Sequence, residues 1–198
     1  FAILIDPDSS YAYVSARAKG VIYKIDVDKR SVVEELAVGP HPYAMAMTGD
    51  GRTLLITRFI SAEQEAQVYK VNLASFNLDG IIKIAADTSS LDTNTSARGV
   101  VNYLMDITIR PGTTVAWIGG KKDNIYRGLY LDGNFGNFQN TVRSVIAKID
   151  YSSNSEVADS KFDLDNTEMT SAIAFSPGGR IAYVANQGNN RVSAYDIE

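Results

Sequence analysis

The feature that most constrains the fold is an internal repeat. Four segments align along the chain: FAILIDPDSSYAYVSA, YAMAMTGDGRTLLITR, YLMDITIRPGTTVAWIGG and TSAIAFSPGGRIAYVAN. Their turns fall at positions 7, 49, 111 and 177, and the centres of the strands that follow fall at 14, 56, 118 and 184. Both anchors therefore advance by 42, 62 and 66 residues. Repeats in this range of lengths are typical of propeller blades or another repeat array.

Each unit predicts four short β-strands. The first alternates, as in AMAM or AIAF, and a turn rich in Pro, Gly, Asp and Ser leads to a second such as YAYVSA. The third resembles VIYKIDV, and the fourth resembles SVVEELAV, GIIKIAA or EVADSKFDL. No segment has a convincing helical period. We therefore expect an all-β chain, a single β-propeller domain over 1–198 with antiparallel four-stranded blades at about 1–38, 43–86, 103–164 and 170–198.

Two sets of residues recur at equivalent positions in the units. Bulky residues of the second strand are expected to fill the space between blades: Tyr13, Leu55, Trp117 and Tyr183. Short polar residues end the third strand: Asp26, Asn72, Asp150 and Asp196. A short acceptor side chain can hold the following turn, and a catalytic group is needed only once. We therefore interpret the polar set as scaffold.

The composition excludes several classes of protein. The chain has no cysteine and one histidine, which excludes disulfides, thiol catalysis and any site that needs two imidazoles. The net charge of −4 is mild and no Lys/Arg cluster forms a basic stripe, so we expect no nucleic-acid partner. No apolar run approaches the roughly 18 residues of a membrane span, so we expect no transmembrane segment.

Two segments carry a resemblance to a known family. VGPHPYAMAMTGDGRTLLIT and SAIAFSPGGRIAYVANQGNNRVSAYDIE resemble repeats of the bacterial YVTN family of seven-bladed propellers, although TGDG and RPGT depart from its consensus turn. RGVVNYLMDITIRPG, KKDNIYRG and NTVRSVIAKIDY are similar to a secreted subgroup that is often joined to c-type haem domains. The resemblance implies a periplasmic, extracellular or cell-surface location. The chain has no Cys-x-x-Cys-His motif, so a haem would lie in another part of the protein.

The four units supply 4 + 4 + 4 + 3 strands, because no fourth strand follows the last third strand. An open arc of blades would expose apolar faces at both ends. We therefore expect the chain to be a segment of a larger, seven-bladed propeller, with a partner chain that completes the ring as the alternative.

The residues in excess of the shortest repeat fall into two insertions, 87–102 and 126–141. The first joins the fourth strand of one blade to the first strand of the next, and the second joins a second strand to a third strand. In an up-and-down blade these two connections emerge on the same face of the disc. We call it the long-loop face, and the opposite one the short-turn face. Long loops on a rigid scaffold commonly carry binding residues.

Cationic, amide and aromatic side chains are concentrated at this face. The polar candidates are His41, Arg58, Arg98, Asn102, Lys121, Lys122, Asp123, Asn124, Arg127 and Arg143, and the aromatic ones are Tyr126, Tyr130, Phe135 and Phe138. Guanidinium groups with rigid rings suit recognition of a carboxylate, a sugar or a protein partner. The alternative is that the rings pin the long loops to the disc and the charges are merely solvated.

Two further sites are suggested by short motifs. Asp163 and Asp165 of DLDNTE, and the segment LDGNFGN, place carboxylate or amide oxygens together, as Ca²⁺ requires, although such runs also occur in ordinary turns. His41 could act as a general base, or it could be a residue of the turn that Pro40 and Pro42 enclose.

The sequence favours a non-catalytic module of a secreted or cell-surface protein, which binds a partner or ligand at the long-loop face. No nucleophile elbow, phosphate loop or dinucleotide fingerprint is present. The alternatives are the propeller portion of a redox enzyme whose haem or quinone lies elsewhere, a lactonase-like propeller enzyme, and a surface-layer building block. Fold alone does not choose between them.

Overall fold

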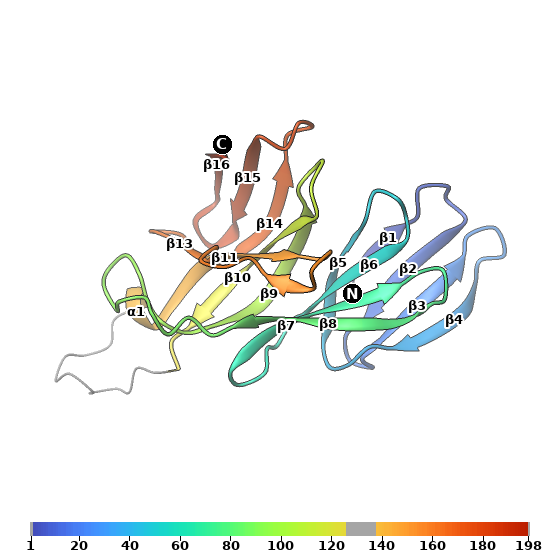
Figure 1. Ribbon diagram of the computed structural model, residues 1–198, viewed down its shortest axis with the longest axis horizontal. Coiled ribbons are helices and arrows are strands. Elements are labelled where there is room, and N and C mark those ends of the chain that lie inside the picture. The colour runs from blue at the N-terminus through green and yellow to red at the C-terminus, as the bar shows by residue number, and fades with distance from the viewer. Residues whose placement is uncertain (1, 126–137, 198) are drawn as a thin grey trace.

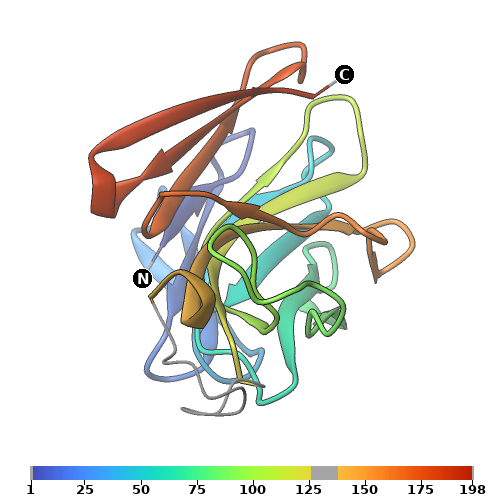
Figure 2. The ribbon, with the colours of Figure 1, turned by 90° about the vertical axis from the view of Figure 1, so that its left-hand side faces the viewer.

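The computed structural model describes residues 2–125 and 138–197 and places them in four antiparallel sheets. In Figure 1 the sheets follow one another as blades of an arc, from the blue sheet on the right to the red sheet at the upper left. Figure 2 shows the same succession from the side. The all-β propeller architecture predicted from the repeat is confirmed, with about four blades in this chain.

The first two blades have four strands each in simple sequence order. Blade 1 contains β1 (Ile3–Ile5), β2 (Tyr11–Ala16), β3 (Val21–Asp26) and β4 (Ser31–Ala37). Blade 2 contains β5 (Pro42–Met47), β6 (Thr53–Arg58), β7 (Glu65–Asn72) and β8 (Asn77–Ala85).

The other two blades depart from this pattern. Blade 3 contains β9 (Val100–Ile109), β10 (Val115–Asp123) and β11 (Val142–Asp150), and both β12 (Ser155–Glu156) and β13 (Phe162–Leu164) pair with β11. Blade 4 contains β14 (Thr170–Phe175), β15 (Ile181–Asn186) and β16 (Arg191–Asp196).

All four sheets share one register between their first two strands. The paired residues are Ile3 with Val14, Met45 with Ile56, Ile107 with Ile118, and Ile173 with Val184. The second member of each pair is the strand centre that anchored the sequence alignment. The repeat in sequence is therefore a repeat of backbone pairing.

Apolar clusters fill each junction between blades. Tyr13 packs with blade 2 residues at the first junction, Leu55 with blade 3 residues at the second, and Trp117 with blade 4 residues at the third. Three of the four bulky residues thus fill the space between blades as predicted.

The prediction for Tyr183 is not tested by the four described blades, in which this side chain is 43% exposed. It lies on the face of blade 4 against which no other described blade packs. The outer face of blade 1 has the same character, since Ile3 of β1 is 72% exposed whereas its equivalent Ile107 is 2% exposed. The two ends of the arc therefore present apolar side chains.

Blade 3 corrects three expectations about element boundaries. β9 begins at Val100, inside the range 87–102 that was predicted to be an insertion, so part of the excess lengthens the sheet. The predicted fourth strand EVADSKFDL is split into β12 and β13, and Asp159 between them has a positive φ of 51° that interrupts the strand. Short helices form at α1 (Phe138–Thr141) and η1 (Gln187–Asn189).

The polar residues at the ends of the third strands hold turns as predicted in three blades. Asp26 accepts the Lys29 amide, Asn72 accepts the Ala74 amide, and Asp150 accepts the Ser152 amide. Asp196 instead pairs with Arg180 at 3.0 Å. Among the described residues, no helix is long and apolar enough to cross a membrane.

Candidate ligand-binding face

The two long connections meet at one end of blade 3. The Asn124 amide nitrogen Nδ2 donates to Asp92 Oδ1 of the 86–99 connection and to the Asn140 carbonyl oxygen of α1. In both ribbon views the green 86–99 loop lies beside α1 (Figures 1 and 2). The prediction that the connections emerge on the same face is therefore confirmed for their described parts.

Neighbouring lysines on β10 have opposite environments because successive strand residues point to opposite faces of the sheet. Lys122 points to the same side as Ile118, toward blade 2, and is 2% exposed. Its ammonium lies 2.8 Å from a carboxylate oxygen of Asp87 and 2.8 Å from one of Asp163. Lys121 points the other way and is half-buried. Sequence reasoning placed both lysines on an open surface, but Lys122 is inside the protein.

Arg143 is also buried, with 3% of its surface exposed. Its Nη2 lies 3.1 Å from Asp165 Oδ1, its Nη1 donates to the Asn94 carbonyl oxygen at 3.1 Å, and its Nε lies 3.7 Å from Asp163. We call Asp87, Lys122, Arg143, Asp163 and Asp165 the blade 3 network. It fastens both inter-blade connections of blade 3 to the ends of β10 and β11.

The electrostatics of Asp87 match this structural role. Burial acts to raise its pKa, but hydrogen bonds from Lys122 and Ser90 outweigh burial and hold the pKa of Asp87 well below its ordinary value. A glycine permits the close approach that brings Asp87 to this position. Gly99 pairs with Asp87 and has a φ of 145°, and a Cβ there would lie 2.2 Å from the Asp123 carbonyl oxygen.

Three further predicted site residues have partners within the fold. Arg98 pairs with Asp92 at 2.8 Å, which lowers the pKa of Asp92 against the opposing effect of burial. Arg58 donates to the Ile60 carbonyl oxygen and to Gln67. Asn102 accepts the Ser61 amide and donates to Asp123. These residues stabilise loops at the long-loop face.

Arg127, Tyr126, Tyr130 and Phe135 lie outside the described residues, as does the LDGNFGN segment. Phe138 begins α1, and its side chain is not described.

Asp163 and Asp165 do not fit the predicted Ca²⁺ site. Asp163 lies between Lys122 and Arg143, and Asp165 pairs with Arg143, so each carboxylate is already faced by a cation. Within the described ranges, no group of three or more acidic or histidine side chains could hold a metal ion. Asn166 of the same motif donates a hydrogen bond from its side-chain amide to Asp165 Oδ2.

A second group of side chains at this face is partly exposed to solvent. Phe59 stacks on Tyr103 with ring centroids 4.7 Å apart and 14° between the planes, and Tyr43 lies 4.7 Å from Phe59 on its other flank. The Arg17 guanidinium carbon lies 4.0 Å from the Phe59 centroid, and Lys121 Nζ lies 4.2 Å from the Tyr103 centroid. We call Tyr43, Phe59 and Tyr103 the aromatic row and Arg17 and Lys121 its end cations.

The backbone holds the centre of the row in place. The Phe59 amide donates to the His41 carbonyl oxygen, and the Leu104 amide donates to the Phe59 carbonyl oxygen. Tyr103 has a positive φ of 46° at a break in the β9 to β10 register. The row therefore connects blades 2 and 3 across the long-loop face, its end cation Arg17 extends it to blade 1, and Tyr103 is 40% exposed.

A cavity lies at each end of the row. One of about 310 Å³ at the junction of blades 1 and 2 is lined by Arg17, Lys19 and His41 together with small residues. The other, of about 190 Å³ between blades 3 and 4, is lined by Tyr103, Lys121, Ser144 and residues of the 167–169 segment. Ser144 is buried there, and its hydroxyl has no hydrogen-bond partner among the described residues.

Sequence reasoning included His41 and Lys121 but missed Arg17 and the aromatic row. Arg17 lies in the short turn between the second and third strands of blade 1, and such turns belong to the long-loop face by the same topological rule as the insertions. This topological rule could therefore have added Arg17 to the candidate residues from the sequence alone.

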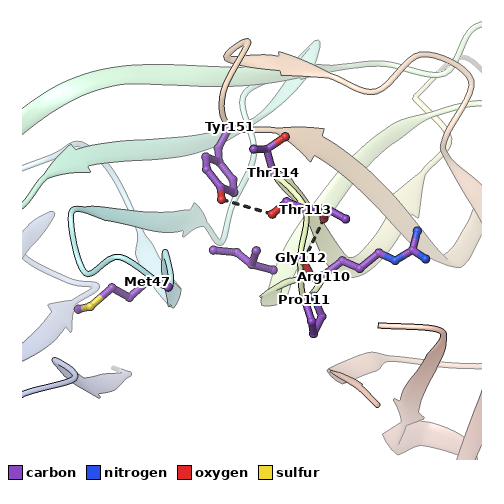
Figure 3. Close-up of a pocket in the computed structure, with 9 residues that line it drawn as sticks. Met47, Arg110, Pro111, Gly112, Thr113, Thr114 and Tyr151 are labelled. Atoms are coloured by element: carbon purple, nitrogen blue, oxygen red, sulfur yellow. Dashed lines mark hydrogen bonds between the residues drawn. The ribbon is translucent and has the colours of Figure 1, made fainter. Parts of the chain in front are cut away.

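A larger hollow, of about 740 Å³, lies on the short-turn face between blades 2 and 3. Figure 3 shows Tyr151, whose hydroxyl bonds the Thr113 carbonyl oxygen at 3.4 Å, and Arg110, which reaches away from the hollow. The Arg110 Nε donates to the Gly179 carbonyl oxygen of blade 4. The one cation that lines this hollow is engaged elsewhere, so the hollow offers fewer groups for a ligand than the aromatic row does.

No protein-family model matches the sequence, and no curated protein matches it. Solved structures with the same fold include Kuenenia stuttgartiensis hydrazine synthase, with a TM-score of 0.77, 16% identity and coverage of 98% of this chain and 51% of that one. They also include a putative 6-phosphogluconolactonase from Bacteroides fragilis, with a TM-score of 0.63, 17% identity and coverage of 100% and 50%.

Dihydro-haem d1 dehydrogenase NirN is similar at a TM-score of 0.55 and 13% identity, over 99% of this chain and 37% of that one. The chain thus spans about half, or less, of the length of these structures. At such identities the likeness concerns the fold alone, and it shows that the four sheets are part of a β-propeller-like architecture.

Proposed function

We propose that this chain is a non-catalytic, YVTN-like propeller module that binds a ligand at the long-loop face through the aromatic row and its end cations. The observation that carries the proposal is the row itself. Three rings from two blades and a cation from each neighbouring strand or turn form one solvent-exposed surface with a cavity at either end.

One of the two end cations, Arg17, supports this assignment because of what it contacts, whereas Lys121 is paired with Asp123 at 2.7 Å. Arg17 makes ring contacts and no hydrogen bond or ion pair with any residue that the structure describes. The guanidinium group carries five N–H donors. In the blade 3 network, by contrast, Arg143 is surrounded by carboxylates and a carbonyl oxygen. The donors of Arg17 are therefore available to a ligand.

We further propose that additional blades of the same repeat cover the exposed end faces of the arc. Ile3 and Ile5 of blade 1, and Tyr183 and Val192 of blade 4, are more than 40% exposed. The similar structures are about twice as long as this chain. A periplasmic, extracellular or cell-surface location is proposed from the YVTN resemblance. A compact monomer of the 198 residues that binds no apolar dye would contradict the extra blades.

The experiment on the binding face compares Tyr103→Ala with Tyr151→Ala, which removes a half-buried tyrosine from the short-turn face. The protein is screened against a panel of small organic anions, sugars and short peptides by thermal shift, and hits are measured by calorimetry. Binding that is weakened by Tyr103→Ala and retained by Tyr151→Ala supports the proposal. No hit, or hits that depend on Tyr151 alone, would contradict it.

The alternative is a lactonase-like enzyme or the propeller portion of a redox enzyme. The names of the similar structures favour this alternative, but at 13–17% identity they relate the fold alone. A purified protein that hydrolyses a sugar lactone, with turnover that His41→Ala abolishes, would favour the enzyme over the binding module.

A further inference from the structure

The cavity at the junction of blades 1 and 2 has a distinct chemical character. Its hydrogen-bonding side chains come from two turns of the long-loop face: the cations Arg17 and Lys19 from the turn between β2 and β3, and the imidazole of His41 from the turn before β5. Its remaining lining residues are alanine, glycine and proline. No acidic side chain lines it, although the protein as a whole has a net charge of −4. The cavity is therefore a local concentration of donors and positive charge.

These cations form no ion pair within the described residues, although the charge of Glu35 acts on Lys19. Lys19 Nζ donates to the Tyr23 hydroxyl at 2.7 Å, and this bond raises the pKa of Lys19, so its ammonium stays charged. The Arg17 guanidinium carbon lies over the Phe59 ring, 4.0 Å from its centroid, and this contact uses none of the guanidinium N–H donors in a hydrogen bond to a described residue. Neither side chain has an ion-pair partner among the described residues.

The floor of the cavity is backbone. Gly20 has a φ of 74°, and a Cβ there would lie 2.7 Å from the Gly39 carbonyl oxygen. His41 also has a positive φ, of 56°, and its carbonyl oxygen fixes Phe59. The two turns therefore approach each other too closely for a side chain to lie between them, and the cations form the walls.

We propose that this cavity binds the oxyanion group, a carboxylate or a phosphate, of an organic ligand whose apolar part lies along the aromatic row. The inference rests on the proposed function. A planar guanidinium offers paired donors to an oxyanion, an ammonium adds charge and donors, and an imidazole N–H adds a further donor.

The test uses four probes on the full protein: inorganic phosphate, phenyl phosphate, acetate and benzoate. Calorimetry is expected to show that each ring-bearing probe binds more tightly than its counterpart without a ring. Arg17→Ala is expected to weaken both ring-bearing probes about tenfold, the loss of one charge-assisted interaction. Lys19→Ala and His41→Ala are expected to weaken them severalfold. Comparison of the two phosphate probes with the two carboxylate probes shows which oxyanion the cavity binds more tightly.

The matched control is Arg52→Ala, which removes an exposed arginine from the short-turn face and changes the net charge equally. It is expected to change affinity less than twofold. Circular dichroism checks that every variant is folded.

An equal loss in Arg52→Ala, or binding that is insensitive to Lys19→Ala and His41→Ala, would overturn the oxyanion site. If the ligand found by the panel still depends on Tyr103 in that case, the proposed binding face stands and this inference alone fails. Absence of binding by all four probes at millimolar concentration also overturns the inference.

Discussion

Two groups of cationic side chains at the long-loop face have opposite environments. In the blade 3 network, Lys122 and Arg143 are almost fully buried and faced by Asp87, Asp163 and Asp165. At the aromatic row, Arg17 rests on a ring and faces no described carboxylate. The comparison teaches that a cation at this face is part of the scaffold where the fold surrounds it with carboxylates, and keeps donors for a ligand where, as at Arg17, it lies on aromatic rings alone.

The largest expected effect separates the buried from the exposed cations. Lys122→Met would leave two buried carboxylates without their shared cation, so we expect unfolding free energy to fall by about 3–5 kcal/mol. Lys83→Met, at an exposed ion pair with Glu65, should cost less than about 1 kcal/mol. Urea unfolding of both variants measures the difference. Equal losses of unfolding free energy in the two variants would contradict the distinction between the blade 3 network and an exposed ion pair.

Acid should weaken the blade 3 network. The pKa of Asp87 is lowered in the folded state by hydrogen bonds from Lys122 and Ser90, against the opposing effect of burial. Its stabilisation is therefore present above the unfolded pKa of about 3.9 and is lost as pH falls through the lower folded pKa. Asp87→Asn should cost about 1.5–3 kcal/mol at pH 7 and flatten the acid limb of a stability curve. An unchanged acid limb would show that other carboxylates dominate.

Asp106 offers the converse case, a buried carboxylate with no described cation beside it. Burial raises its pKa, although the Ile173 and Ile107 amides donate to it. Its ionisation therefore opposes folding, so its contribution to stability falls as pH rises through the folded pKa. Asp106→Asn keeps an acceptor for the Ile173 amide and should leave stability at pH 7 unchanged or higher by up to about 1 kcal/mol. A large loss in chemical denaturation would contradict this reading.

The smallest expected effect on stability is at the row. Arg17→Ala removes contacts with Phe59 and Tyr43, which at an exposed site contribute about 0.5–1 kcal/mol. We expect a change of that size in thermal unfolding, alongside the loss of oxyanion affinity. A loss as large as that of Lys122→Met would assign Arg17 to the scaffold instead.

Much of the fold could be predicted because it follows from local periodicity. The alternating strands, the turns and the spacing of Val14, Ile56, Ile118 and Val184 predicted four equivalent sheets, and the register confirms this. The topology of an up-and-down blade also predicted that the two long connections lie together, as the Asn124 bonds to Asp92 and Asn140 confirm. These predictions needed only near neighbours in sequence.

The candidate site could be predicted less well, because burial depends on residues far along the chain. Lys122 meets Asp87, 35 residues before it, and Arg143 meets Asp165, 22 residues after it. Nothing local distinguishes Lys122 from Lys121, yet alternation along β10 sends one into the network and the other to Tyr103. The aromatic row could not be predicted locally either, because its rings, Tyr43, Phe59 and Tyr103, come from two blades.

The sequence by itself determined the all-β class, the repeat and the face on which the long connections emerge, since strand period and turn chemistry act over a few residues. Only the tertiary structure decided which cations are scaffold and which are open to a ligand. The physical reason is that the exposure of a side chain and the donors it keeps free depend on the partners that packing brings to it. For Lys122 those partners are carboxylates, and for Arg17 they are aromatic rings.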